Sequence, residues 1–198
     1  MELADSDRSI VVVIDLQGRL MGMVHRPALV LAATRRLLQL AELYQVPVVL
    51  TEQYPERLGA TNPEVLEVFD TLTTPKRRLS KITFGCFGDP GFEQALGELR
   101  PGLAPSERQL IVAGIEVHIC VMQTALAALR TGHQVQVCWE AVSCRGEEYR
   151  QWALERLQQA GAQITNHESV GFEWAGHKDH PQFKKMSRLW LEGQLTGD

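Results

Sequence analysis

A carboxylate, an ammonium group and a thiol lie at points along this 198-residue chain where predicted elements begin or end. Asp15 directly follows the apolar run 10–14. Its carboxylate is therefore expected at the end of a strand, where it can act as a general base. An Asp at such a place can equally cap the turn that follows it. The catalytic interpretation of Asp15 needs partners elsewhere in the chain.

Cys120 is the candidate nucleophile. It lies near the start of a predicted helix, soon after the apolar run 110–114. The positive end of a helix favours the thiolate, so we expect a lowered thiol pKa for Cys120. Amides of the same turn lack partners within the helix and can hold an oxyanion. The alternative is a buried thiol that only packs, as expected for Cys138, whereas Cys86 and Cys144 stay without an assigned role.

Lys81 is the candidate cation, because it precedes an apolar, Gly-rich loop that begins at Phe84. If it projects into the same crevice, its ammonium stabilises both a carboxylate and a thiolate. The alternative is a solvated lysine, which is the expectation for the basic residues 76–78 just before it. The side chains expected to line a substrate pocket are Gln17, Tyr54, Phe84 and Phe87, with core packing as the alternative for the two phenylalanines.

Histidines are not expected to act in this site. His118 lies two residues before Cys120, and side chains two apart in a strand-to-helix turn point in different directions, so no Cys–His dyad is expected. His177 and His180 lack a third ligand nearby and are expected at the surface. The sequence thus predicts no metal site and no cofactor.

The apolar pattern predicts the elements that position these side chains. Short β-branched runs alternate with helical patterns, as expected for βαβ units with central strands covered on both faces. We predict strands at 9–15, 46–51, 110–114, 135–139 and, weakly, 162–166, helices at 27–45, after 117 and at 147–160, a helical closing segment around 183–190, and loops at 52–63 and 84–91. The expected fold is a single α/β domain over residues 1–198, a three-layer α/β/α sandwich with a mostly parallel, Rossmann-like sheet. Its crevice is expected at the carboxyl ends of the strands.

The net charge indicates which kinds of binding partner to expect, and the cysteines indicate the cellular compartment. The chain has 20 basic and 24 acidic residues, for a net charge of -4, so neither a nucleic acid nor an anionic membrane is expected as a partner. The expected partner is a small molecule. Four cysteines without a CxxC pair favour a reducing compartment, and the acidic N-terminus fits no signal peptide, so we expect a cytoplasmic protein.

Three segments together resemble the isochorismatase-like cysteine hydrolases: IDLQ at 14–17, Lys81 followed by Phe84, and GIEVHICV at 114–121. Further segments, TEQYPERLGAT at 51–61 and HPQFK at 180–184, look like the subgroup of isochorismatase domain-containing proteins. The resemblance implies a triad in which Asp15 takes the thiol proton and later serves the attacking water. Lys81 would fix the charges, and Cys120 would form a thioester.

The resemblance also implies the geometry of the turn before the nucleophile. A non-proline cis peptide is expected between Ile115 and Glu116, a bond that costs about 3 to 4 kcal/mol and persists only where its surroundings impose it. The oxyanion hole would then consist of the backbone N–H groups of Glu116 and Cys120.

Two departures from the family pattern narrow the expected reaction. Nicotinamidases carry an Asp-x-His metal pair where this chain has residues 51–54, TEQY, so metal-dependent nicotinamidase activity is not expected. True isochorismatases lack the nucleophilic Cys, which this chain retains at Cys120. The leading hypothesis is therefore hydrolysis of a C–N bond in a small amide whose identity the sequence does not give.

Other hypotheses stay open beside the hydrolase. The chain can be a catalytically idle binding or scaffold protein that retains the fold. It can also be a redox-sensing thiol protein in which Cys86 or Cys144 forms a reversible disulfide. We further expect self-association into a dimer or larger assembly, because Phe183, Met186 and Trp190 offer an apolar face in the closing segment.

Overall fold

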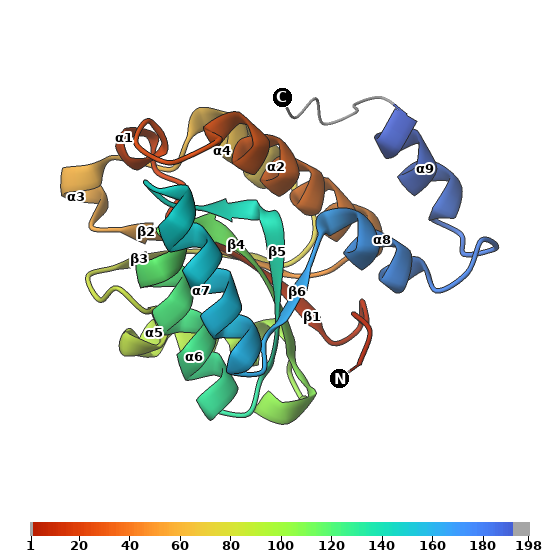
Figure 1. Ribbon diagram of the computed structural model, residues 1–198. Helices are drawn as coiled ribbons and strands as arrows, with labels where there is room; N and C mark the ends of the chain where they lie inside the picture. The colour runs from red at the N-terminus through yellow and green to blue at the C-terminus, as the bar shows by residue number, and fades with distance from the viewer. Residues whose placement is uncertain (1, 192–198) are drawn as a thin grey trace.

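Six strands run side by side across the residues that the computed structural model describes, 2–191. They are β1 (Ser9–Ile14), β2 (Val48–Gln53), β3 (Lys76–Lys81), β4 (Gln109–Ile115), β5 (Gln134–Ser143) and β6 (Gln163–Thr165). Their order in the sheet is β3-β2-β1-β4-β5-β6, and every pair is parallel (Figure 1). The predicted Rossmann-like sheet is confirmed.

Helices cover both faces of this sheet, as Figure 1 shows. One layer holds α2 (Pro27–Tyr44), α4 (Pro63–Thr71), α8 (His167–Ala175) and α9 (Phe183–Leu191), and the other holds α5 (Pro90–Leu99), α6 (Met122–Arg130) and α7 (Glu147–Gln159). Two short helices, α1 (Gly18–Met21) and α3 (Pro55–Leu58), follow the ends of β1 and β2. The predicted three-layer sandwich is therefore confirmed.

The central strand explains why the sheet is buried on both faces. Every residue of β1 is buried, and its side chains alternate between the layers, as they must in a strand. Val11 and Val13 join the core beneath α2, whereas Ile10, Val12 and Ile14 join the core beneath α6. A continuous apolar run is thus the pattern of a strand between two helical layers.

Strand β3 was not expected, because its sequence KRRLSK is polar. It forms the edge of the sheet, where charged side chains are tolerated and discourage further pairing. The basic residues are not simply solvated: Lys76 Nζ donates to three carbonyl groups, including Phe69 O at 2.7 Å, and Arg77 and Arg78 pair with Glu98 and Glu52.

The closing segment forms α9 as predicted, but its apolar side chains pack on the chain's own core. Met186 is fully buried and contacts Tyr44, while Phe183 and Trp190 are partly buried against the same cluster. The face that was expected to drive self-association is therefore covered. Among residues 2–191, no helix has both the length and the apolar character needed to cross a bilayer.

Candidate active site

The three candidate catalytic residues lie at one edge of the sheet, where the parallel strands end. Asp15 follows β1, Lys81 is the last residue of β3, and Cys120 lies in the turn after β4. The strand order reverses between β1 and β4, which is the point where open α/β sheets bind ligands. Asp15 and Glu116 leave the sheet there with left-handed φ values of 57° and 53°, so the chain turns sharply on both sides of the crevice.

Asp15 and Lys81 form a buried ion pair. The Lys81 Nζ donates to Asp15 Oδ2 at 2.6 Å, and the two side chains are only 2% and 1% exposed. The other carboxylate oxygen, Oδ1, accepts a hydrogen bond of 2.9 Å from the Thr51 hydroxyl. A buried carboxylate needs such partners because burial without them strongly disfavours its charge.

Cys120 lies in a π-helical turn, Val117–Val121, that continues into α6. Burial raises the pKa of its thiol to about 12, and the negative charge of Asp15 adds to the increase, against a smaller lowering by Lys81. The expected lowering of this pKa is wrong. The positive end of the helix favours the thiolate, but removal of the thiol from water and the charge of the nearby carboxylate disfavour it more strongly. The resting thiol is protonated, so a base must remove its proton.

Cys86 belongs to the same cluster, although the sequence left it unassigned. Its thiol donates to Thr51 Oγ1 at 3.9 Å, and that hydroxyl donates to Asp15. Its backbone N–H donates to Thr124 Oγ1 at 3.0 Å, and the Thr124 hydroxyl donates to Cys120 O. Burial raises the pKa of Cys86 to about 11, so this thiol is a hydrogen-bond donor inside the site.

Polar residues at the end of β2 contact the Asp15–Lys81 ion pair, and the sequence analysis did not predict them. Thr51 and Gln53 are two residues apart and therefore share a face of the strand, where they contact Asp15 and Lys81. Glu52 points the other way, toward Arg78 and Thr61. Polar residues two apart at the end of an otherwise apolar strand were the available signal.

The turn before Cys120 differs from the expectation. All peptide bonds among residues 2–191 are trans, so the expected cis bond between Ile115 and Glu116 is wrong, and the reversal comes from the left-handed Glu116. The Glu116 carboxylate accepts from Arg145 Nε at 3.1 Å. His118 stacks on Tyr149 with ring centroids 5.3 Å apart, and its Nδ1 lies 3.6 Å from the Glu116 carboxylate.

A cavity of about 420 Å³ lies beside this cluster and shares Lys81 with it. Its other lining residues come from the start of α3, the end of β3 and the start of α5: Tyr54, Pro55, Glu56, Ser80, Ile82, Thr83, Gly88, Asp89 and Pro90. Of the expected pocket residues, Tyr54 lines this cavity. Phe84 is 57% exposed nearby, and its carbonyl oxygen accepts from Lys81 Nζ at 3.0 Å.

The other two expected pocket residues lie elsewhere. The Phe87 ring packs against Phe92 and His133 in the helical layer, with centroids 5.1 and 5.6 Å apart. Gln17 is fully buried, and its amide binds the backbone of Gln53 and Gly59. An amide used in this way holds the chain in place and is not available to a substrate.

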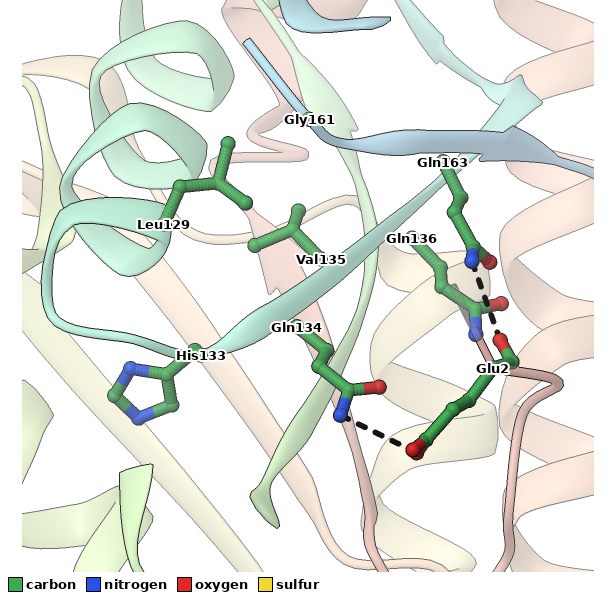
Figure 2. Close-up of a pocket in the computed structure, with 8 residues that line it drawn as sticks. All are labelled: Glu2, Leu129, His133, Gln134, Val135, Gln136, Gly161 and Gln163. Atoms are coloured by element: carbon green, nitrogen blue, oxygen red, sulfur yellow. Dashed lines mark hydrogen bonds between the residues drawn. The ribbon is translucent and has the colours of Figure 1, made fainter. Parts of the chain in front are cut away.

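A second cavity, of about 290 Å³, lies at the opposite edge of the sheet (Figure 2). Its lining includes Gln134 and Gln163, the first residues of β5 and β6, and Figure 2 shows both amides directed toward Glu2. None of the three candidate catalytic residues lines it. The candidate active site is therefore at the carboxyl edge, beside the cavity at Lys81.

Comparison with known proteins gives one family. Residues 9–169 match the isochorismatase domain. Isochorismatase domain-containing protein 1 of Danio rerio is 34% identical over 175 residues, which are 88% of this chain and 58% of that protein. The chain thus spans little more than half the length of this relative. A secreted isochorismatase effector of Phytophthora sojae is 34% identical over 187 residues, 93% of this chain and 85% of that protein.

Solved structures share the architecture. The structure of a protein named MAR1 ribonuclease from Caenorhabditis elegans superimposes with a TM-score of 0.87 at 30% sequence identity. The match covers 100% of this chain and 95% of that chain. The similarity therefore includes the whole sheet and the strand ends at which Asp15, Lys81 and Cys120 lie.

Proposed function

Because the chain belongs to the isochorismatase family, we propose that it is a cysteine hydrolase that cleaves the C–N bond of a small organic amide. The observation that carries the proposal is the buried Asp15 carboxylate, which is bound to Lys81 at 2.6 Å and raises the pKa of the Cys120 thiol. Base, cation and nucleophile come from three different strand ends and meet in one water-poor cluster.

The proposed reaction starts with proton transfer from the Cys120 thiol to Asp15 as the sulfur attacks the amide carbonyl. Backbone N–H groups of Glu116 and Cys120 hold the resulting oxyanion. When the C–N bond breaks, the amine leaves with the proton from Asp15, and a thioester remains. Asp15 then takes a proton from a water molecule that attacks the thioester, which releases the acid and restores the thiol.

Lys81 has an electrostatic role in this scheme. Its ammonium pairs with the Asp15 carboxylate at 2.6 Å and lowers the pKa of Cys120, against the larger effects of burial and of Asp15. Without a cation, a buried carboxylate would tend to stay protonated and could not accept the thiol proton. The proposal needs neither a metal nor a cofactor.

The remaining parts of the proposal concern the extent of the domain, its cellular compartment and its oligomeric state. We propose that one domain spans residues 1–198, that it acts in the cytoplasm and that it self-associates. The four free thiols support a reducing compartment. Raised pKa values at both Cys86 and Cys120 leave little thiolate at neutral pH, which disfavours redox sensing as the main role.

RNA is a less well supported substrate, although the similar C. elegans protein is named a ribonuclease. RNA-binding surfaces usually present free basic side chains to phosphates. In the most basic segment, β3, the charges of Arg77 and Arg78 are already paired with Glu98 and Glu52. The net charge of -4 points the same way.

An amide library tests the proposal against these alternatives. We expect Cys120-dependent release of amine from at least one small amide, and labelling of Cys120 by an acyl or aldehyde probe. Both should be lost in Cys120→Ala and kept in Cys138→Ala, a matched change at another buried thiol. Undiminished labelling or turnover in Cys120→Ala contradicts the mechanism, and Cys120-dependent cleavage of RNA with no amide turnover contradicts the substrate class.

A further inference from the structure

The Lys81 ammonium has no proton left for a substrate. Its Nζ lies 2.6 Å from Asp15 Oδ2, 2.7 Å from Gln53 Oε1 and 3.0 Å from Phe84 O, with Thr83 O farther away at 3.3 Å. A lysine ammonium has three protons, and the three shortest contacts use all of them. Lys81 therefore acts on the site through its charge and its hold on Asp15.

Gln53 is the neutral side chain among these partners, and its amide can lie in only one orientation. Its Oε1 faces Lys81, which has only donors, and its Nε2 donates to Ile82 O at 2.7 Å, which can only accept. A reversed amide would set donor against donor and acceptor against acceptor. The negative end of the amide dipole is thus fixed toward the ammonium.

Gln17 fixes the backbone of Gln53 in turn. The Gln53 N–H donates to Gln17 Oε1 at 2.7 Å, and Gln17 Nε2 donates to Gln53 O at 2.9 Å and to Gly59 O at 2.6 Å. Gln17 also donates its own N–H to Asp15 O at 2.7 Å. Asp15 and Lys81 are therefore joined twice, directly and through these two glutamines.

We propose that Gln53, supported by Gln17, is a positioning residue that holds the Lys81 ammonium on Asp15 and away from the substrate. The proposal rests on the proposed function only in treating Cys120 as the nucleophile. In this arrangement the cation stays fixed while charge moves between Asp15 and the thiol. No reorganisation of Lys81 is then needed during the reaction, which is how a preorganised charge contributes to catalysis.

The test places a negative charge at this position with Gln53→Glu and measures how fast iodoacetamide alkylates Cys120, by mass spectrometry of its peptide. The new carboxylate competes with Asp15 for Lys81, and an added anion raises the thiol pKa. Below its pKa a thiol reacts in proportion to its thiolate fraction, so a rise of about one unit slows alkylation roughly tenfold at each pH from 7 to 10. Gln159→Glu, an exposed change on α7, should leave the rate unchanged. An unchanged rate in a Gln53→Glu protein that melts cooperatively overturns the proposal.

If Gln53→Glu does not fold, a second variant tests whether Gln53 holds the Lys81 ammonium. Gln53→Met removes the amide oxygen that accepts from Lys81 without adding a charge. NMR of ¹⁵N-labelled lysine ammonium groups then measures how fast the Lys81 protons exchange with solvent. We expect one slowly exchanging ammonium signal in the wild type, absent in Lys81→Met, and exchange at least about tenfold faster in Gln53→Met because one proton loses its partner. An unchanged signal in Gln53→Met overturns the proposal.

Neither measurement uses a substrate, so the two proposals fail separately. Slowed alkylation of a chain that hydrolyses no amide would keep the role of Gln53 and remove the proposed function. Amide hydrolysis by the wild type, together with an unchanged alkylation rate in Gln53→Glu, would keep the proposed function and remove the role of Gln53.

Discussion

At the residue scale, the carboxylate of Asp15 has two opposite effects on Cys120. Its charge helps to raise the pKa of the thiol to about 12, after burial as the larger cause, and in the proposed mechanism its oxygen takes the thiol proton. A thiol held protonated until a carbonyl arrives is protected from other electrophiles. Reactivity is then coupled to proton transfer within the site.

Asp15→Asn should separate these two effects. Removal of the negative charge lowers the pKa of Cys120, so iodoacetamide should alkylate this thiol faster at any pH below its pKa. Hydrolysis of an amide should slow by roughly 10² to 10⁴, because the general base is lost. Asp70→Asn, an exposed change on α4, is the control. Slower alkylation together with slower hydrolysis would contradict the assigned role.

At the element scale, the crevice depends on how closely β1 and β4 approach each other. Ile14 and Gly114 are register partners at the ends of these strands. A Cβ atom on Gly114 would lie 2.5 Å from Ile14 O and 2.7 Å from Ile14 Cβ. Only glycine allows the two strands to pair here, directly before the turns that carry Asp15 and Glu116.

Gly114→Ala should therefore destabilise the protein and disturb the site. Gly161→Ala is the matched control. Both glycines have a positive φ, 149° at Gly114 and 104° at Gly161, but the Cβ position of Gly161 lies in open space. Both changes carry backbone strain, so the difference in unfolding free energy between them isolates the clash. We expect Gly114→Ala to cost about 1 to 3 kcal/mol more, the usual range for overpacking. Equal urea midpoints for the two variants would show that the strands can move apart freely.

At the scale of the whole molecule, part of the apolar surface that remains exposed lies beside the candidate site. Ile82 is 80% exposed, Phe84 57% and Tyr54 43%, all near the cavity that contains Lys81. Grouped apolar side chains of this size often mark an interface. The apolar face of α9 packs on the chain's own core, so we propose that a second copy of the chain packs against this edge, where three exposed apolar side chains lie together.

Self-association through this edge makes a definite prediction. Light scattering of the wild type should give a mass of at least two chains, and Ile82→Glu should weaken the assembly at least about tenfold, because a charge would be buried in the interface. Leu3→Glu is a matched control at an exposed leucine near the opposite edge, where Gln109 at the start of β4 binds its carbonyl. A monomeric wild type at all concentrations would contradict this proposal.

The sequence by itself determined five of the six strands and the two strand ends that carry Asp15 and Cys120, whereas β3 and the helices α4, α5 and α8 were not predicted. Unbroken apolar runs such as 110–114 predict strands covered on both faces, and parallel strands bring their carboxyl ends to one edge. Asp15 and Cys120 could therefore be assigned to a common crevice. The edge strand β3 was missed because an edge needs no apolar pattern.

Only the tertiary structure decided which groups meet and in what state. Hydrogen-bond partners of Lys81, the place of Cys86 beside Thr51 and the use of Gln17 as a backbone clamp depend on residues far apart in the chain. The pKa of Cys120 shows the same limit, since a local helix start predicts a decrease, and burial together with Asp15 produces an increase. Local periodicity fixes where a side chain leaves its strand, whereas its charge state follows from the solvent and the neighbours that folding gives it.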